Sequence, residues 1–239
     1  AWWGYCHQQS LNERFGGVGS EMPEMVAVAT YRRPALLRDC IDTLLPQLSD
    51  EDLLLIVDND PEGSARAVVD QMESRIIRYV VEPTPGIAAA RNRALEYFAE
   101  MNGRFAALSF VDDDETVCPA WLSNHIATAA RYAADATFGP VHPVYLAETP
   151  SWVKRLDFFA RAESSTGSSV KWPATNNVRI CSDLLTTIPV LMFDERYSST
   201  GGSDTDFFFR ARQRGATLIW TSEGAVREVV PAGRANVRW

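Results

Sequence analysis

The sequence predicts an α/β fold in which a mostly parallel central sheet is flanked by helices. Three observations support this class. Short apolar runs alternate along the chain with amphipathic stretches, which is the order of strands joined by helical crossovers. The runs are apolar at nearly every position rather than at every second one, as in strands buried on both faces. Several of them end in polar residues, and the carboxyl ends of parallel strands are where such sheets bind ligands.

The first half of the chain predicts strands and helices in strict alternation. Pro34 suits the first turn of a helix, apolar residues follow it at helical spacing, and Pro46 ends or kinks that helix. A polar helix over 62–73 and a helix with one apolar face over 87–98 come next. The predicted strands between them are 25–29, 53–57, 76–81 and 105–111.

The second half predicts shorter elements. Its helices are 120–133, 150–161 and 204–214, the last closed by Gly215 at a position that favours a positive φ. Its strands are 217–220, 225–230 and a strand-like stretch at 136–145 that Pro140 and Pro143 interrupt. Residues 163–177 form a polar loop rich in Ser, Thr and Gly, long enough to suggest a functional element.

Length and composition indicate an ordinary globular protein. The chain has 239 residues, 46% hydrophobic and 23% charged. We interpret 1–24 as an N-terminal extension that need not be native, because it lacks periodicity and contains a glycine-rich run. Residues 25–239 then form one domain, with a nucleotide-binding half over 25–118 and an acceptor and catalytic half over 119–239.

Charge and cysteine content limit the partners and the compartment. A formal net charge of -8 repels polyanions, so nucleic acid is not an expected partner. No apolar run approaches the roughly 20 residues that cross a bilayer, and the sequence shows no secretory signal. Four scattered cysteines without a C-x-x-C pair are typical of reduced thiols in a cytosolic protein. We therefore expect a cytoplasmic protein.

Polar residues at three strand ends should meet at one edge of the sheet. They are Thr30-Tyr31-Arg32, Asp58-Asn59-Asp60 and Asp112-Asp113-Asp114. Three consecutive carboxylates repel one another unless a positive group lies among them. Mg²⁺ or Mn²⁺ is the natural partner, because each prefers oxygen ligands and also accepts diphosphate oxygens. A solvated acidic turn or a helix cap is the alternative for the triplet alone.

Other candidate residues are isolated or lie later in the chain. Asp58 could accept a hydrogen bond from a nucleobase or ribose, or it could simply form a turn. Arg91 could bind a phosphate, or it could form an ion pair within the protein. Asp204 follows Gly201-Gly202 at a predicted helix start, where it can cap the helix or act as a general base. The three histidines lack metal-ligand spacing, and phosphate-binding G-x-x-x-x-G-K-[ST] and G-x-G-x-x-G motifs are absent from the sequence.

An ordered series of motifs resembles family 2 glycosyltransferases of the GT-A fold. The resemblance extends from about Val26 to Arg234 and is closest to enzymes of succinoglycan-type bacterial exopolysaccharide synthesis. It implies a Rossmann-like central sheet with a smaller mixed sheet on the acceptor side. The motifs are VATYRRP at 28–34, VDND at 57–60, PGI at 85–87, ARN at 90–92, VDDDE at 111–115, FGPV at 138–141, TNN at 175–177, GSDTDF at 202–207 and VREVVP at 226–231.

The resemblance implies a role for each matching position. Asp204 is implied as the catalytic base of an inverting transfer, and Asp114 as the metal ligand. Nucleotide binding is implied for Thr30, Tyr31, Arg32, Asp58, Arg91, Asp112 and Asp113. Contact with the sugar or acceptor is implied for Asn176, Asn177, Gly202 and Ser203. Relatives often carry Glu where Ser203 stands and His where Glu228 stands, so the role of Glu228 stays open.

The resulting hypothesis is a Mn²⁺- or Mg²⁺-dependent transfer of a hexose, with glucose expected, from a UDP-sugar to a hydroxyl group. The acceptor is a lipid-linked or soluble saccharide in bacterial polysaccharide or glycoconjugate synthesis. The resemblance also allows peripheral association with the inner face of the plasma membrane. A sugar nucleotidyltransferase and a non-catalytic nucleotide-sugar-binding module are the two alternatives.

Overall fold

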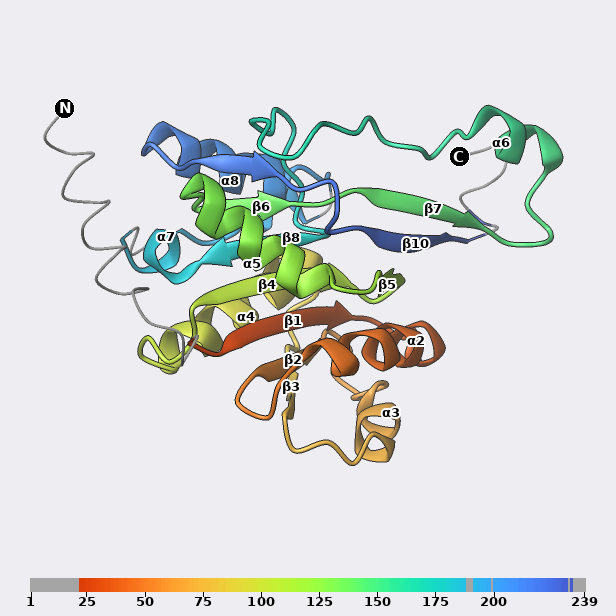
Figure 1. Ribbon diagram of the computed structural model, residues 1–239. Coiled ribbons are helices and arrows are strands. Elements are labelled where there is room, and N and C mark those ends of the chain that lie inside the picture. The colour runs from red at the N-terminus through yellow and green to blue at the C-terminus, as the bar shows by residue number, and fades with distance from the viewer. Residues whose placement is uncertain (1–21, 188–190, 199, 232, 234–239) are drawn as a thin grey trace, which may run out of the picture.

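The computed structural model describes residues 22–187, 191–198, 200–231 and 233. Most of the predicted N-terminal extension lies outside these residues. A seven-stranded sheet in the order β3-β2-β1-β4-β8-β6-β9 forms the centre, and a three-stranded sheet in the order β5-β10-β7 lies beside it (Figure 1). The described helices include none that is long and apolar enough to cross a membrane.

The first four strands are parallel, as predicted. They are β1 (Glu24–Thr30), β2 (Leu53–Asp58), β3 (Ile77–Val81) and β4 (Ala107–Asp112). Their register aligns the predicted polar ends, because Thr30 pairs with Asp58 and Ala29 pairs with Asp112. The residues that follow these strands therefore emerge at one edge of the sheet.

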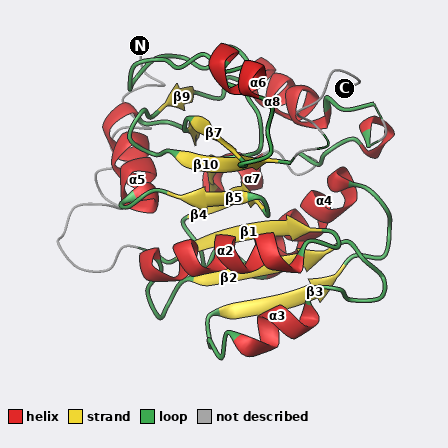
Figure 2. Ribbon diagram, turned by 90° about the vertical axis from the view of Figure 1, so that its right-hand side faces the viewer, coloured by secondary structure: helices red, strands yellow, loops and turns green. Residues whose placement is uncertain are grey.

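Helices cover both faces of this sheet (Figure 2). Successive side chains of a strand point to opposite faces. Val26 and Val28 of β1 accordingly pack with α2 (Pro34–Leu44), while Met25 and Ala27 pack with α4 (Ile87–Glu100). Double coverage explains why the strand sequences are apolar at nearly every position. The helix α3 (Arg66–Gln71) is shorter than the predicted 62–73.

The second half extends the central sheet with one antiparallel strand. The strand β8 (Val178–Cys181) lies antiparallel between β4 and β6 (Ala136–Phe138), and β9 (Leu218–Trp220) pairs parallel with β6. Sequence reasoning missed β8 because Arg179 interrupts its apolar run. Arg179 is buried there because its guanidinium pairs with the Glu24 carboxylate of β1, with Nε to Oε2 at 2.9 Å.

The small sheet is mixed, as expected. The strand β10 (Val226–Val230) pairs antiparallel with β5 (Glu115–Val117) and parallel with β7 (Val141–Tyr145). The predicted stretch 136–145 is therefore two strands in different sheets, divided at Gly139 and Pro140. A Cβ on Gly139 would lie 1.8 Å from the carbonyl oxygen of Gly224, so only glycine permits this crossing.

The remaining helices agree with the prediction at α5 (Trp121–Tyr132) and α8 (Ser203–Gln213) but not at α6 (Ser151–Leu156). The predicted helix 150–161 was too long, because Asp157 takes a left-handed φ of 46° and ends it. Short elements that the sequence did not predict are α7 (Ser182–Thr187), η1 (Leu45–Gln47) and η2 (Glu195–Tyr197). The three described cysteines, Cys40, Cys118 and Cys181, are free.

Candidate functional site

The acidic triplet lies at the sheet edge beside the residues that follow β1. The hydroxyl of Thr30 donates to Asp113 Oδ2 at 2.8 Å. The Nη1 of Arg33 lies 3.1 Å from Asp113 Oδ1 and 3.0 Å from Asp114 Oδ2, so one guanidinium nitrogen bridges both carboxylates. Asp113 and Asp114 are almost buried, whereas 41% of the Arg33 side chain is exposed. The positive group among these carboxylates is Arg33, where the sequence predicts Mg²⁺ or Mn²⁺; binding of that cation stays a prediction.

The pKa values of these groups reflect burial in competition with pairing. Burial raises the pKa of Asp113, and the hydrogen bond from Thr30 together with the charge of Arg33 opposes that rise. For Arg33, burial alone would lower the pKa, but the charges of Asp113 and Asp114 raise it above its ordinary value. Each group thus helps to keep the other charged.

The donor chemistry of this pair of carboxylates fits a divalent cation. Two hard oxygen ligands already converge on one point that a cationic nitrogen occupies. No three His, Cys, Asp or Glu side chains of the described residues are grouped to hold a metal by themselves. A magnesium-type ion commonly takes one or two carboxylates and completes its shell with substrate phosphates and water. Asp113 and Asp114 could hold such an ion if the Arg33 side chain moved aside.

Asp112 and Glu115 shape the turn that presents the triplet. The Asp112 carboxylate pairs with Nη2 of Arg91 at 3.3 Å, so Arg91 forms the ion pair that the sequence left as an alternative. Glu115 is buried and accepts from the backbone N–H of Asp112 at 2.9 Å. Burial raises the pKa of Glu115 well above its ordinary value, and the charge of Asp112 adds to this rise.

The end of β2 is internally hydrogen bonded. Asp58 is fully buried and accepts from the Tyr79 hydroxyl at 2.7 Å and from the backbone N–H groups of Asp60 and Ala65 at 3.0 and 2.8 Å. Arg32 donates two hydrogen bonds to Asp60, at 3.0 and 3.2 Å. These bonds fix the loop after β2, and a contact of Asp58 with a nucleobase stays a prediction.

Tyr31 offers the exposed surface at this edge. The residue is 51% exposed, and the guanidinium carbon of Arg32 lies 5.1 Å from its ring centroid. The side chain amide of Asn59 donates to the carbonyl groups of Glu82 and Thr84, while its oxygen accepts from the N–H of Gly86 at 2.8 Å. Asn59 therefore holds the turn before α4 against the end of β2.

The two predicted asparagines have different surroundings. Asn177 is fully buried, where it donates to the carbonyl groups of Pro140 and Gly224 and accepts from Trp121 Nε1 at 2.7 Å. A sugar contact through Asn177 stays a prediction that would require these bonds to break. Asn176 is half-buried and donates to Glu115 Oε1 at 3.1 Å, which places it next to the triplet's turn.

Arg161 connects this turn to the small sheet. It donates to Asn176 Oδ1 at 3.0 Å and to Glu228 Oε2 at 3.2 Å. Glu228 lies directly opposite Glu115 in the pairing of β10 with β5. Arg161 and Asn176 thus connect the two facing carboxylates by hydrogen bonds, while the charge of Glu228 still contributes to the raised pKa of Glu115.

Asp204 lies in the first turn of α8. Gly201 and Gly202 have φ values of 76° and 98°, which explains the glycine pair by backbone conformation. Gly202 occupies the N-cap position, so the capping role considered for Asp204 is not observed. The half-buried Asp204 carboxylate accepts from the backbone N–H of Thr205 at 3.0 Å. No described hydrogen bond joins it to the triplet.

Stacked side chains nevertheless connect α8 to the acidic triplet. Phe207 of α8 stacks on Phe193 with ring centroids 4.3 Å apart and an interplanar angle of 12°. The guanidinium carbon of Arg91 lies 5.8 Å from the Phe193 ring centroid, and Arg91 pairs with Asp112. Asn92 secures Phe193 by hydrogen bonds to its backbone carbonyl and N–H groups at 2.9 and 2.7 Å. The start of α8 is thus held relative to the end of β4.

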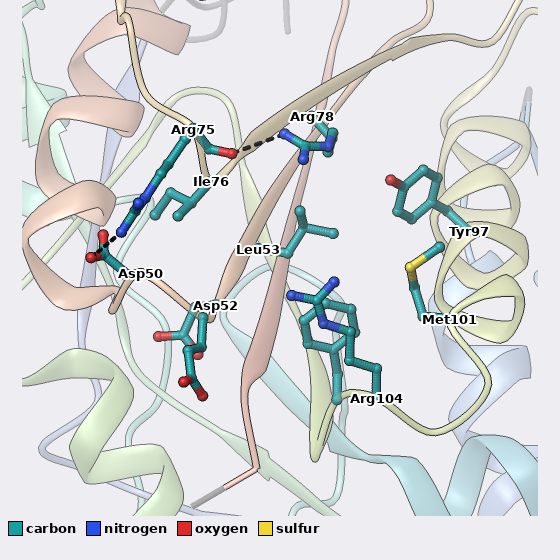
Figure 3. Close-up of a pocket in the computed structure, with 11 residues that line it drawn as sticks. Asp50, Asp52, Leu53, Arg75, Ile76, Arg78, Tyr97, Met101 and Arg104 are labelled. Carbon is teal, nitrogen blue, oxygen red and sulfur yellow. Dashed lines mark hydrogen bonds and ion pairs between the residues drawn. The ribbon is translucent and has the colours of Figure 1, made fainter.

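A hollow of about 510 Å³ lies at the opposite edge of the sheet (Figure 3). Leu53 at the start of β2 and Ile76 just before β3 line it, together with Arg75, Arg78 and Arg104. Arg75 pairs with Asp50, and Arg78 donates to the carbonyl of Arg75. Since parallel sheets bind ligands beyond the carboxyl ends of their strands, this hollow is separate from the predicted site.

Comparison with known proteins identifies the family. The family model described as "Glycosyl transferase family 2" matches residues 25–184. A succinoglycan biosynthesis protein, ExoM of Rhizobium meliloti (strain 1021), is 34% identical over 230 residues, which cover 90% of this chain and 69% of ExoM. The chain belongs to glycosyltransferase family 2. The resemblance inferred from the ordered motifs is thereby confirmed.

Solved structures confirm the fold of this family 2 glycosyltransferase as GT-A. S. aureus TarS matches with a TM-score of 0.67 and 17% identity over 87% of this chain, which spans 37% of the TarS chain. TarS residues 1–349 in complex with UDP-GlcNAc match with a TM-score of 0.65 and 16% identity, over 90% of this chain and 60% of that one. GalNAc-T7 with UDP, GalNAc and Mn²⁺ matches at 0.69 and 11% identity, over 91% of this chain and 45% of that one.

Three residues of this site were not assigned a role from the sequence. Arg33 lies in the same strand-end motif as Thr30, and the need for a positive group among the carboxylates was a usable signal for it. Glu115 directly follows the triplet, and a fourth carboxylate at that position is the signal that could have pointed to a buried or paired group. No sequence pattern pointed to Arg161, because its contacts are with residues 15 and 67 positions away.

Proposed function

We propose that this glycosyltransferase transfers a hexose, with glucose expected, from a UDP-sugar to a hydroxyl group of a saccharide, with inversion and with Mn²⁺ or Mg²⁺. One observation supports this most directly. Asp113 and Asp114 converge on a single cationic nitrogen at the sheet edge, and two carboxylates placed in this way could hold a Mg²⁺-type ion that also takes substrate phosphates. Structures of TarS with UDP-GlcNAc and of GalNAc-T7 with UDP and Mn²⁺ agree with a UDP-sugar donor.

The donor side is proposed to act by binding and charge neutralisation. Tyr31 offers its exposed ring to the nucleobase, with Thr30, Arg32 and Asp58 shaping that pocket. Asp114 would hold the metal together with Oδ1 of Asp113, and the Oδ2 side of Asp113 would face the ribose, with Asp112 and Arg91 in support. When bound, the cation would stabilise negative charge on the diphosphate as it leaves.

The bond-making step is assigned to Asp204. Its carboxylate accepts the proton of the acceptor hydroxyl as the hydroxyl oxygen attacks the anomeric carbon. The bond between that carbon and the β-phosphate oxygen breaks on the opposite side, and UDP leaves with the bonding electrons. Gly202, Ser203, Asn176 and Asn177 are proposed to line the sugar and acceptor side, where a saccharide, soluble or lipid-linked, would enter.

Release of UDP tests the proposal. The chain should release UDP, and not pyrophosphate, from a UDP-hexose in a manner that depends on Mn²⁺ or Mg²⁺. Asp204→Asn should lower turnover by about 10²–10⁴-fold while UDP binding, measured by calorimetry, stays unchanged. Asp206→Asn is the matched control two residues away, since Asp206 pairs with Arg210 at 2.8 Å. Near-normal turnover in Asp204→Asn would remove this residue from the mechanism.

A further inference from the structure

Three large apolar side chains are exposed on and after the short helix α6. Trp152 is 37% exposed, Leu156 is 66% exposed and Phe158 is 68% exposed. Trp152 and Leu156 are four residues apart, so they share one face of the helix. The Trp152 and Phe158 rings meet edge to face with centroids 6.3 Å apart. Large apolar side chains grouped in the open in this way point to an interaction site.

This segment is held firmly, so the exposure is not a consequence of a loose chain. Val153 points inward and is 1% exposed, in a small core with Val230 of β10. The Tyr145 hydroxyl of β7 donates to Asp157 Oδ1 at 2.8 Å and accepts from the N–H of Phe159 at 3.2 Å. The fold therefore presents the three apolar side chains outward while anchoring the residues between them.

Basic residues are interleaved with the apolar ones. Lys154 and Arg155 are both exposed in the last turn of α6. The one carboxylate within the segment, Asp157, already accepts from Tyr145. The local charge of the segment is thus positive in a chain whose formal net charge is -8. We define the apolar-basic patch as Trp152, Lys154, Arg155, Leu156 and Phe158.

We propose that the apolar-basic patch docks on the surface of an anionic phospholipid bilayer. Trp favours the interface between headgroups and acyl chains, and Leu and Phe side chains insert beside it. Lys and Arg next to such a face are attracted to anionic headgroups over a short range. A protein partner of negative charge or a second copy of the chain would also meet an apolar surface, but the alternation of Trp and Phe with Lys and Arg favours a lipid interface.

The position of the patch relates it to the donor site. In Figure 1, β7 and β10 run outward to α6, away from α8. Arg161, three residues after Phe158, reaches Asn176 and through it Glu115 beside the triplet. Because Arg161 is only three residues from the patch, docking would turn the Arg161 and Asn176 side of the site toward the membrane. This consequence, presentation of a lipid-linked acceptor, rests on the proposed function, whereas docking itself does not.

Sedimentation with vesicles tests the docking directly. The full chain should bind vesicles that contain phosphatidylglycerol more tightly than vesicles of phosphatidylcholine alone, and added salt should weaken the binding. Replacing Trp152 and Phe158 together by Ser should lower the partition coefficient by at least about tenfold, because two aromatic side chains leave the interface. Lys154→Gln with Arg155→Gln should remove the preference for anionic vesicles.

Matched control variants distinguish binding through this patch from nonspecific binding to vesicles. Phe209→Ser removes another exposed phenylalanine, which is 57% exposed on α8. Arg214→Gln removes a basic residue just after the same helix. Both control variants should bind anionic vesicles as tightly as the parent chain does. No binding of the parent chain to anionic vesicles would overturn the proposal, as would equal loss in the α8 controls. A parent dimer that the Trp152 and Phe158 variant dissociates would assign the patch to a second copy instead.

The proposed sugar transfer and the proposed membrane docking are tested by different measurements, so one can be refuted without the other. UDP release from a UDP-hexose without vesicles reports on the donor site alone, and the patch variants should keep it. Retained UDP release also shows that these variants are folded. Loss of vesicle binding with intact UDP release would therefore support the docking surface, whatever the identity of the acceptor.

Discussion

Replacing Arg33 by Gln tests whether this arginine holds the place of a divalent cation. Its Nη1 bridges Asp113 and Asp114 at 3.1 and 3.0 Å, and 41% of the side chain is exposed. A metal ion that binds between the two carboxylates must displace this nitrogen. The Thr30 hydroxyl, 2.8 Å from Asp113 Oδ2, would still position Asp113 in the variant. We therefore expect Arg33→Gln to bind Mn²⁺ more tightly than the parent chain.

The expected gain in Mn²⁺ affinity comes from the two Arg33 ion pairs, which the metal no longer has to break in the variant. Because the guanidinium is partly exposed, solvent screening limits each pair to about 0.2–1 kcal/mol. Two pairs together correspond to about 0.4–2 kcal/mol, or roughly 2- to 30-fold in the dissociation constant at about 1.4 kcal/mol per tenfold. Removal of a positive charge beside the ion acts in the same direction.

The assay is the binding of Mn²⁺ alone, followed by the paramagnetic resonance signal of the free ion. Arg32→Gln is the matched control, because the neighbouring Arg32 pairs with Asp60 and not with the triplet. The control should bind Mn²⁺ less tightly than Arg33→Gln does. An unchanged or weaker affinity in Arg33→Gln would refute the view that arginine and metal share one position.

Two further predictions concern stability. Glu24→Ala or Arg179→Met alone should lower the free energy of unfolding by about 3–5 kcal/mol, because each leaves a buried charge without its partner. The double variant Glu24→Leu with Arg179→Met should recover most of that loss, as measured by urea denaturation. A loss in the double variant equal to the sum of the two single losses would contradict this. Burial lowers the pKa of His125 from 6.5 to about 4, so the unfolded chain binds an extra proton between these values. Stability should therefore decrease by about 3 kcal/mol as the pH is lowered from 6.5 to 4. His125→Gln should remove that part of the pH dependence, and an unchanged slope would exclude His125 as its source.

The central sheet could be predicted because its causes are local. Apolar strands covered on both faces have a recognisable composition, as residues 25–29 and 53–57 show. The errors occurred where a distant residue decides the structure. The strand β8 carries Arg179, which is tolerated only because Glu24 lies beside it, 155 residues away in the sequence. The stretch 136–145 divides between two sheets because Gly139 packs against Gly224.

The sequence by itself determined the fold class, the family and the sheet edge at which the acidic triplet lies. The fold class and the sheet edge follow from residue order and strand periodicity, and the family follows from the resemblance of its ordered motifs; all three rest on neighbouring positions. Only the tertiary structure decided which group neutralises the triplet and which side chains are free to meet a ligand. It placed Arg33 between Asp113 and Asp114, and it enclosed Asp58 and Asn177 in hydrogen bonds. The physical reason is that burial and pairing depend on contacts between distant segments, which a local pattern does not encode.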